Sequence, residues 1–257
     1  MNVAVLVKWV PEPSGTPTLG PDHRLVREGA DGSLDPGDEF GLERALQLME
    51  RDGGEVTAVS MGPEVAAGAV QRALAMGASR GALVTDDALG GADTLVTARA
   101  LSAALASAGP FDLVVAAVES TDGYTGTLPV TLAELLAMPS VTFATSFDVL
   151  DGSTLHAERQ TAAGTEVVEC PLPALVTVTT SVAEPRYPSL KGVMAAKSKP
   201  LDRLSLDSLG LTPDDVRATQ SIVSVEAAPA KSGGRVVEAG PETAAEIADL
   251  LAEARVI

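Results

Sequence analysis

The fold class is decided by residues 56–77, which read VTAVSMGPEVAAGAVQRALAMG. The opening Val-Thr-Ala-Val-Ser favours a strand, because it is rich in β-branched residues. Gly62 and Pro63 then begin a helix whose apolar residues recur every three or four positions as far as Gly77. A strand that leads directly into an amphipathic helix is typical of a parallel sheet covered by helices.

The same alternation of strand and helix repeats on both sides of this unit. We therefore predict an α/β fold with a doubly wound, mostly parallel sheet. A hairpin formed by residues 24–26 and 32–34 is expected within the long first connection, and a second hairpin between residues 154 and 169. Residues 174–180 are expected to return to the sheet. The predicted strands lie at residues 2–8, 55–60, 81–85, 112–118 and 140–147, and the predicted helices at residues 38–51, 63–76, 93–107 and 126–137.

Composition narrows the class of protein. The chain has 257 residues, 46% of them hydrophobic, and a mean hydropathy of +0.21, so it can bury a core of its own. A formal net charge of −17 argues against a nucleic-acid-binding surface, which needs clustered cations.

With Cys170 as the single cysteine and only two histidines, an intrachain disulfide is excluded and a structural zinc site is not expected. No apolar run approaches the roughly 20 residues that span a bilayer, and no basic region precedes the first strand, so we expect a cytoplasmic protein without membrane insertion.

The best candidate for a ligand site is the glycine-containing loop after the strand at 112–118. Residues 117–126 read AVESTDGYTG and lead into a helix. In open α/β sheets, ligands bind beyond the carboxyl ends of strands and at helix N-termini. Asp35 and Pro36 begin another helix, where ordinary capping accounts for both residues without a ligand. The chain contains neither Gly-x-Gly-x-x-Gly after a strand nor a P-loop, so neither motif supports a nucleotide site.

The positive charge of the chain gathers in residues 184–200, which read EPRYPSLKGVMAAKSKP. Three of the five lysines of the chain lie within nine positions here. Pro185 and Pro188 restrict the backbone, and Ser189 is a suitable N-cap for a short helix that ends before the next proline. Two interpretations remain. One is a solvated loop followed by a helix turn that packs Leu190 into the core, and the other is a stiff loop that docks a partner.

These stretches resemble the β subunit of electron-transfer flavoprotein. The resemblance rests on Glu-Pro-Arg-Tyr-x-Ser-Leu at 184–190 with Met194 and the lysine-rich run that follows, on residues 73–80 and on residues 117–126, and it covers nearly the whole chain. It implies a heterodimer whose α subunit makes most contacts with FAD, while this chain binds AMP structurally and has no catalytic residue of its own. It also implies that acyl-CoA dehydrogenases or other flavin dehydrogenases supply electrons, which pass toward the respiratory chain.

The resemblance also implies roles for particular residues, with Leu190 as the anchor for a partner dehydrogenase. Several residues depart from the family pattern. Asp35 replaces an asparagine, Glu119 a glutamine, Tyr124 an aspartate and Gln160 the glutamate of an Arg-Glu pair; Lys-Gly-Val at 191–193 replaces Pro-Asn-Ile, and Ser198 interrupts the lysine cluster. Glu119 is expected to weaken nucleotide binding by charge repulsion. The implied nucleotide-binding residues are Leu6, Asp35, Pro36, Gly37, Asp38, Met61, Ala117, Val118, Glu119, Ser120, Thr121, Asp122, Gly123, Tyr124, Thr125 and Gly126, and the implied partner-recognition residues are Arg186, Tyr187, Ser189, Leu190, Lys191, Met194, Lys197 and Lys199.

The C-terminal part of the chain differs from the rest. Residues 1–204 are expected to form the α/β domain, whereas residues 205–257 are thinly apolar and end in a predicted amphipathic helix at 241–254. We expect these residues to form an arm that packs on the α subunit.

Three alternatives stay open. A stand-alone adenine-nucleotide-binding regulatory module and an α/β hydrolase-like enzyme could both use such a sheet, although neither needs the segment at 184–200 or the arm. Within the family, a bifurcating member with a second FAD in place of AMP is also open.

Overall fold

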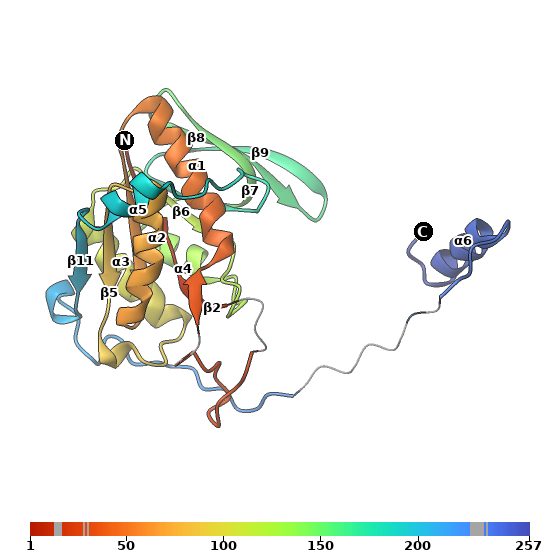
Figure 1. Ribbon diagram of the computed structural model, residues 1–257, viewed down its shortest axis with the longest axis horizontal. Helices are drawn as coiled ribbons and strands as arrows, with labels where there is room; N and C mark the ends of the chain where they lie inside the picture. The colour runs from red at the N-terminus through yellow and green to blue at the C-terminus, as the bar shows by residue number, and fades with distance from the viewer. Residues whose placement is uncertain (13–16, 28, 30, 227–233, 235) are drawn as a thin grey trace. The chain divides into compact units, whose positions relative to one another are not determined.

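The computed structural model of the chain describes residues 1–12, 17–27, 29, 31–226, 234 and 236–257 (Figure 1). These residues form two compact units, Met1–Ile222 and Val223–Ile257. Among its described residues, the second unit contains a single helix, α6 (Thr243–Glu253), on which every residue is exposed or half-buried. In the described part of the chain, no helix is both long enough and apolar enough to cross a membrane.

A nine-stranded sheet forms the centre of the first unit, in the order β11-β5-β4-β1-β6-β10-β7-β8-β9. Neighbouring strands from β11 to β7 are parallel, and β8 and β9 continue the sheet with antiparallel pairs. This arrangement confirms the predicted α/β class with a mostly parallel sheet. The strands are β1 (Asn2–Leu6), β4 (Glu55–Met61), β5 (Arg80–Val84), β6 (Leu113–Ala117), β7 (Ser140–Leu150), β8 (Thr154–Thr161), β9 (Gly164–Pro171), β10 (Ala174–Val178) and β11 (Leu201–Leu204), with β2 (Trp9–Pro11) and β3 (Gly32–Leu34) in a separate small sheet.

Helices cover both faces of the large sheet. On one face, apolar residues of α1 and α2 join Val3 and Val5 of β1 in one core cluster. On the opposite face, α3 and α4 join Ala4 and Leu6. Alternate residues of β1 thus enter different cores, as expected for a strand that is buried on both faces. The helices of this unit are α1 (Pro36–Asp52), α2 (Ala67–Met76), α3 (Thr94–Ala108), α4 (Leu128–Leu135) and α5 (Leu190–Ala196), with short 3-10 turns at Glu64–Ala66, Asp87–Leu89 and Asp207–Leu209.

The hairpin in the first connection pairs differently from the prediction. The expected pairing of residues 24–26 with 32–34 is wrong, because β3 pairs with β2 and one residue of the first run forms an isolated bridge with Leu19. The packing of Trp9, in β2, against Gly32, in β3, accounts for the observed pairing. The Trp9 ring lies so close to Gly32 that any side chain there would collide with it. The second predicted hairpin is confirmed as β8 and β9.

Strand β11 was not predicted. It pairs in parallel with β5 and adds an edge to the sheet. Its four residues are exposed or half-buried, so they carry no apolar pattern that marks a buried strand.

The first unit extends beyond the expected boundary at residue 204. Leu206 is buried in the core that α3 covers. Asp93, the N-cap of α3, accepts hydrogen bonds from the backbone N–H and the hydroxyl of Thr219. The division between the compact units therefore lies after residue 222, and most of the Ala/Ser/Pro-rich stretch of the expected arm lies outside the described residues.

Candidate functional site

The order of the strands places a topological switch between β1 and β6. The chain continues from β1 to β4 and β5 on one side, whereas β6 and β10 lie on the other side. Ligands of open α/β sheets bind at such a point, beyond the carboxyl ends of the strands. Residues 118–126, the switch-point loop, leave the end of β6 here.

Asp35 joins the switch-point loop to the start of α1. Its side chain is fully buried. One carboxylate oxygen accepts the backbone N–H of Gly37 at 2.9 Å and caps the helix. The other oxygen accepts the backbone N–H of Thr121 at 2.7 Å and the Thr121 hydroxyl at 3.2 Å. The structure thus brings the predicted stretches 35–38 and 117–126 together through one carboxylate.

Asp122 is the second anchor of the switch-point loop. Its side chain is 4% exposed, with Lys8 Nζ 2.6 Å from one oxygen and Arg27 Nε 2.7 Å from the other. Lys8 Nζ also donates to the Ser120 hydroxyl at 3.1 Å. Burial alone would raise the pKa of Asp122, but the hydrogen bonds and charges of Lys8 and Arg27 outweigh burial and lower this pKa.

The sequence reasoning missed both cations. Lys8 is the last residue of the first predicted strand, whose carboxyl end lies at the same sheet edge, so its position could have been inferred from the strand pattern. The position of Arg27 could not be inferred from the sequence, because Arg27 lies in the irregular first connection and contacts Asp122 only in the folded chain.

Asp38 has a different electrostatic environment from Asp122. It is 7% exposed, and its Oδ2 accepts the backbone N–H of Lys8 at 2.7 Å. Burial raises the pKa of Asp38 well above its ordinary value, and the charge of Asp35 raises it further, while the hydrogen bond from Lys8 opposes both. The start of α1 therefore disfavours the ionised form of Asp38.

Gly123 of the switch-point loop lies beside three polar side chains. A β-carbon at Gly123 would lie 3.2 Å from Ser120 Oγ, 3.7 Å from Thr125 Oγ1 and 3.9 Å from Lys8 Nζ. Gly126 has a φ of 66°, which residues with a side chain rarely adopt. Helix α4 then begins without a side-chain cap. Two hydroxyl groups and one ammonium group thus lie beside Gly123, and a helix N-terminus follows in the sequence. Groups of this kind suit a small anionic group.

The other implied nucleotide-binding residues lie at the ends of the strands or on the surface. Leu6 and Ala117 are buried, and Met61 is half-buried at the end of β4. Two departures from the family pattern, Glu119 and Tyr124, are exposed. Val118 is half-buried and Pro36 is exposed at the first position of α1.

Segment 184–200 is a loop followed by α5, and three of its implied recognition residues are engaged within the chain. The Ser189 hydroxyl caps α5 by accepting the backbone N–H of Gly192 at 3.0 Å. Arg186 forms ion pairs with two carboxylates of α1. Lys199 Nζ donates to two carbonyl oxygens at the C-terminal end of α2, at 2.9 and 2.6 Å.

The remaining implied recognition residues are exposed. Tyr187 is 90% exposed, Leu190 78% and Met194 66%. Lys191 and Lys197 are also exposed. The alternative in which Leu190 packs into the core is therefore wrong, while its role as an anchor for a partner stays a prediction.

A comparison with known protein families covers both the switch-point loop and segment 184–200. A family model described as "Electron transfer flavoprotein domain" matches residues 22–209, which include the switch-point loop and segment 184–200. The chain belongs to the electron transfer flavoprotein family. The predicted resemblance is thereby confirmed.

Three curated members of the electron transfer flavoprotein family show how far the match extends. The electron transfer flavoprotein subunit β of Mycobacterium tuberculosis is 36% identical over 265 residues, which cover all of this chain and 99% of the relative. That of Bacillus subtilis is 36% identical over 267 residues and covers both chains completely. The caffeyl-CoA reductase-Etf complex subunit CarD of Acetobacterium woodii is 34% identical over 241 residues, 92% of each chain.

Proposed function

We propose that the chain is the β subunit of a heterodimeric electron-transfer flavoprotein, in which an α subunit makes most of the contacts with FAD. The match over the full length of two β subunits at 36% identity carries this proposal. When bound, FAD supplies the electron chemistry, and this chain contributes orientation and electrostatics. The proposed donors are acyl-CoA dehydrogenases or other flavin dehydrogenases, and the proposed destination of the electrons is the respiratory chain.

The switch-point loop is the proposed site of AMP. Gly123 lies beside the hydroxyl groups of Ser120 and Thr125 and the ammonium group of Lys8, and the start of α4, where Thr127 forms no side-chain cap, follows in the sequence. Asp35 and Asp122 have a different role in this proposal. Both carboxylates are buried and paired within the chain, so they shape the loop and do not repel the phosphate directly.

The exposed side chains of segment 184–200 are the proposed contact with dehydrogenases. Leu190 is the proposed anchor, with Tyr187 and Met194 beside it in the sequence. Tyr187 lies in the loop that Pro185 and Pro188 restrict, and Leu190 and Met194 lie on the capped helix α5 that follows. These side chains are therefore presented in few conformations, so binding costs little conformational entropy. Arg186 and Lys199 support the contact by holding the segment on α1 and α2.

Residues 223–257 are the proposed arm on the α subunit. Ile247 and Leu251 of α6 lie four residues apart and are exposed, so this helix carries an apolar stripe. A helix of 11 residues is marginal in water without a partner to cover such a stripe.

A bifurcating protein that binds a second FAD in place of AMP is the second candidate. The similarity to a subunit of a caffeyl-CoA reductase-Etf complex favours it. Both candidates use the same loop, so the identity of the bound nucleotide separates them.

Co-expression with the α-subunit gene from the same genome tests the proposal. We expect a 1:1 heterodimer with visible flavin absorbance that releases FAD and AMP on denaturation, as identified by mass spectrometry. The chain expressed alone should contain no flavin. Release of FAD without AMP, at two equivalents per heterodimer, would favour the second candidate. A stable monomer that binds stoichiometric FAD by itself would overturn the division between the subunits.

A further inference from the structure

Arg186 binds two carboxylates that lie seven residues apart on α1. Its Nε is 2.7 Å from Glu43 Oε2, and its Nη2 is 3.0 Å from Glu43 Oε1 and from Glu50 Oε2. The backbone N–H of Arg186 also donates to Glu43 at 3.2 Å, and its Nη1 donates to Glu50. Because a planar guanidinium meets carboxylates through several hydrogen bonds at once, this contact fixes one orientation of the arginine.

Glu43 is the buried partner of Arg186. Glu43 is 3% exposed, and Gln47 Nε2 donates a further hydrogen bond to its carboxylate at 2.8 Å. Burial alone would raise the pKa of Glu43, but the hydrogen bonds from Arg186 and Gln47 outweigh burial and lower it. Arg186 therefore faces two ionised carboxylates, and it has no surplus positive charge to offer to an acidic partner.

The same helix supports the residue after Arg186. The ring of Tyr187 lies over the guanidinium of Arg72, with 5.9 Å between the ring centre and the guanidinium carbon. Arg72 in turn pairs with Glu39 of α1 at 3.0 Å. Carboxylates of α1 thus hold Arg186 directly and Tyr187 through Arg72.

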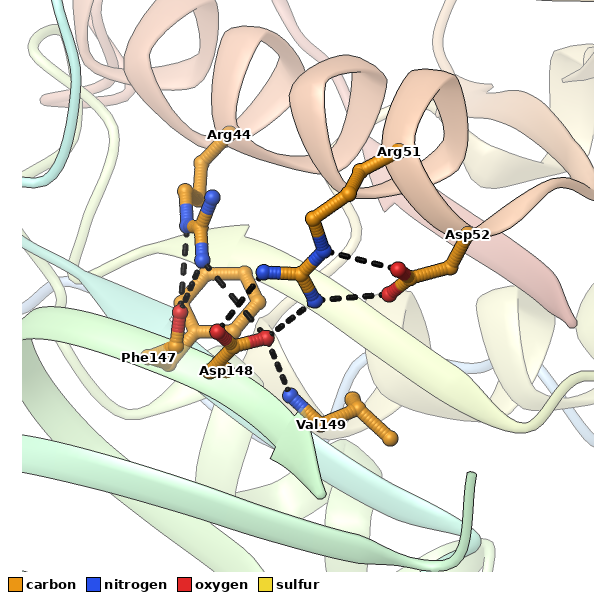
Figure 2. Close-up of polar contacts among 6 residues, drawn as sticks. All are labelled: Arg44, Arg51, Asp52, Phe147, Asp148 and Val149. Carbon is orange, nitrogen blue, oxygen red and sulfur yellow. Dashed lines mark hydrogen bonds and ion pairs between the residues drawn. The ribbon is translucent and has the colours of Figure 1, made fainter. Parts of the chain in front are cut away.

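Helix α1 is itself held on the sheet, because two of its arginines bind strand β7. Arg44 and Arg51 directly follow the two glutamates in the sequence and reach toward β7 (Figure 2). Arg44 Nε donates to the carbonyl oxygen of Phe147 at 3.1 Å, and its guanidinium lies 5.2 Å from the centre of the Phe147 ring. Arg51 Nη1 donates to Asp148 Oδ2 at 2.8 Å. One helix therefore connects segment 184–200 to strand β7 of the sheet.

We propose that Arg186 is a positioning residue and not a partner contact, and that Glu43 fixes through it the direction in which Leu190 faces a dehydrogenase. This role depends on the proposed docking function of segment 184–200. It differs from the role that the family resemblance implies for Arg186, which is recognition of the partner itself.

The charges of the segment lead to the same conclusion. Arg186 is neutralised by α1, and Lys199 is bound to one carbonyl group of α2 and to one just beyond its C-terminal end. Lys191 and Lys197 are the other two cations of the segment, and both are exposed. In this proposal the exposed apolar side chains make the main contact with a dehydrogenase, only Lys191 and Lys197 remain to attract an acidic partner, and the loss of the Arg186 clamp weakens the contact by loosening the loop.

Glu43→Gln tests the positioning role, because it keeps the shape of the side chain and removes its charge. The assay uses the flavin-loaded heterodimer with an acyl-CoA dehydrogenase and its acyl-CoA substrate. We expect the KM for the heterodimer to rise about fivefold, since the loosened loop must be ordered on binding. The kcat, the flavin content and reduction by dithionite should not change. Glu64→Gln is the matched control: Glu64 forms an exposed ion pair with Arg203 at 2.9 Å, and its loss should leave KM unchanged.

A double-mutant cycle with Leu190→Ala separates positioning from direct contact. If Glu43 acts through Leu190, Glu43→Gln should raise KM by less than about twofold in the Leu190→Ala background. An undiminished rise in that background would mean that the clamp contacts the partner independently, and the positioning role would be overturned. If Leu190→Ala alone leaves KM unchanged, the docking function itself fails, which is a separate result from failure of the clamp.

Glu50→Gln replaces Glu43→Gln if the latter heterodimer does not assemble. Glu50 is exposed and supplies the outer half of the clamp, so its loss should disturb folding less. We expect KM to rise about twofold, again with a smaller rise in the Leu190→Ala background. An unchanged KM in this variant would overturn the proposal.

Discussion

The switch-point loop and segment 184–200 place their side chains in opposite ways. In the loop, Asp122 points inward, is 4% exposed and is neutralised by Lys8 and Arg27. In the segment, the charge of Arg186 is also neutralised by the scaffold, but the apolar Leu190 points outward and is 78% exposed. One region gathers polar groups around Gly123, and the other presents apolar surface.

This difference indicates which kind of ligand each region suits. A small polar space with few convergent groups suits a small molecule, because those groups fix its orientation. Rigid apolar side chains on the surface suit a protein partner, where buried area at a few residues dominates the binding energy. Helix α1 contributes to both regions, with Asp35 at its start and Glu43 about two turns further along.

Gly123→Leu should have the largest effect and should act on the switch-point loop alone. The new side chain would fill the space beside Ser120 and Thr125. We expect the purified heterodimer to lose its AMP and to assemble poorly. Nucleotide content after denaturation and size-exclusion chromatography measure the two effects. One equivalent of AMP in this variant would contradict the placement of the nucleotide in this loop.

Asp122→Asn should lower the free energy of unfolding by about 1–3 kcal/mol at pH 7, because it removes the charge that Lys8 and Arg27 share. The folded-state pKa of Asp122 is lowered, so its ion pairs stabilise the fold above the unfolded pKa of about 4. This stabilisation is lost as the pH falls through the folded pKa. Denaturant unfolding at pH 7 and pH 3 should therefore show a smaller difference between variant and wild type at pH 3.

Asp38→Asn is the matched contrast to Asp122→Asn, because the pKa of Asp38 is shifted in the opposite direction. The unfolded chain ionises Asp38 near pH 4, whereas the folded chain ionises it only at a higher pH. The free energy of unfolding therefore falls as the pH rises from about 4 to the folded pKa. An asparagine oxygen can still accept the backbone N–H of Lys8. At pH 7 we expect an unchanged or slightly higher free energy of unfolding. A loss as large as that of Asp122→Asn would show that Asp38 is ionised and stabilising.

Glu43→Gln should lower the free energy of unfolding by about 1 kcal/mol at pH 7, a smaller effect because Arg186 is partly exposed. The folded-state pKa of Glu43 is lowered, so its stabilisation is present above the unfolded pKa of about 4 and is lost as the pH falls below it. Melting temperatures of the two proteins should converge between pH 5 and roughly pH 3. A constant difference across this range would mean that the charge of Glu43 contributes nothing.

Lys191→Gln combined with Lys197→Gln should have the smallest effect. These exposed lysines can speed the approach of an acidic dehydrogenase, but the proposed contact is apolar. We expect the rate of dehydrogenase-dependent flavin reduction at low salt to fall by about two- to threefold, and the difference to vanish at high salt. A tenfold loss that persists at high salt would contradict an apolar contact.

The sequence was sufficient to predict the elements whose apolar residues follow a regular period. The strand and helix of residues 56–77 gave β4 and α2, and the hairpin after β7 was also found. Strand β11 was missed because its residues are not buried. The first connection was paired wrongly because the fit of Trp9 against Gly32 depends on three-dimensional packing and leaves no periodic signal.

The candidate site was predicted only in part, for a related reason. The loop at 117–126 could be located, because the carboxyl ends of parallel strands meet at one edge. Arg27, which neutralises Asp122 together with Lys8, could not be located, because it is 95 residues from Asp122 in the sequence. Arg186 is likewise 143 residues from Glu43, so its role as a clamp became visible only in the fold.

Dehydrogenase-dependent reduction of the flavin in the Leu190→Ala heterodimer tests the central claim most directly, namely that segment 184–200 serves partners while the switch-point loop serves the nucleotide. We predict that kcat/KM falls roughly 30-fold, equivalent to about 2 kcal/mol for an anchor residue. AMP content, flavin content, melting temperature and reduction by dithionite should match the wild type. An unchanged kcat/KM, or a loss fully explained by lower stability or lost nucleotide, would contradict this division of roles.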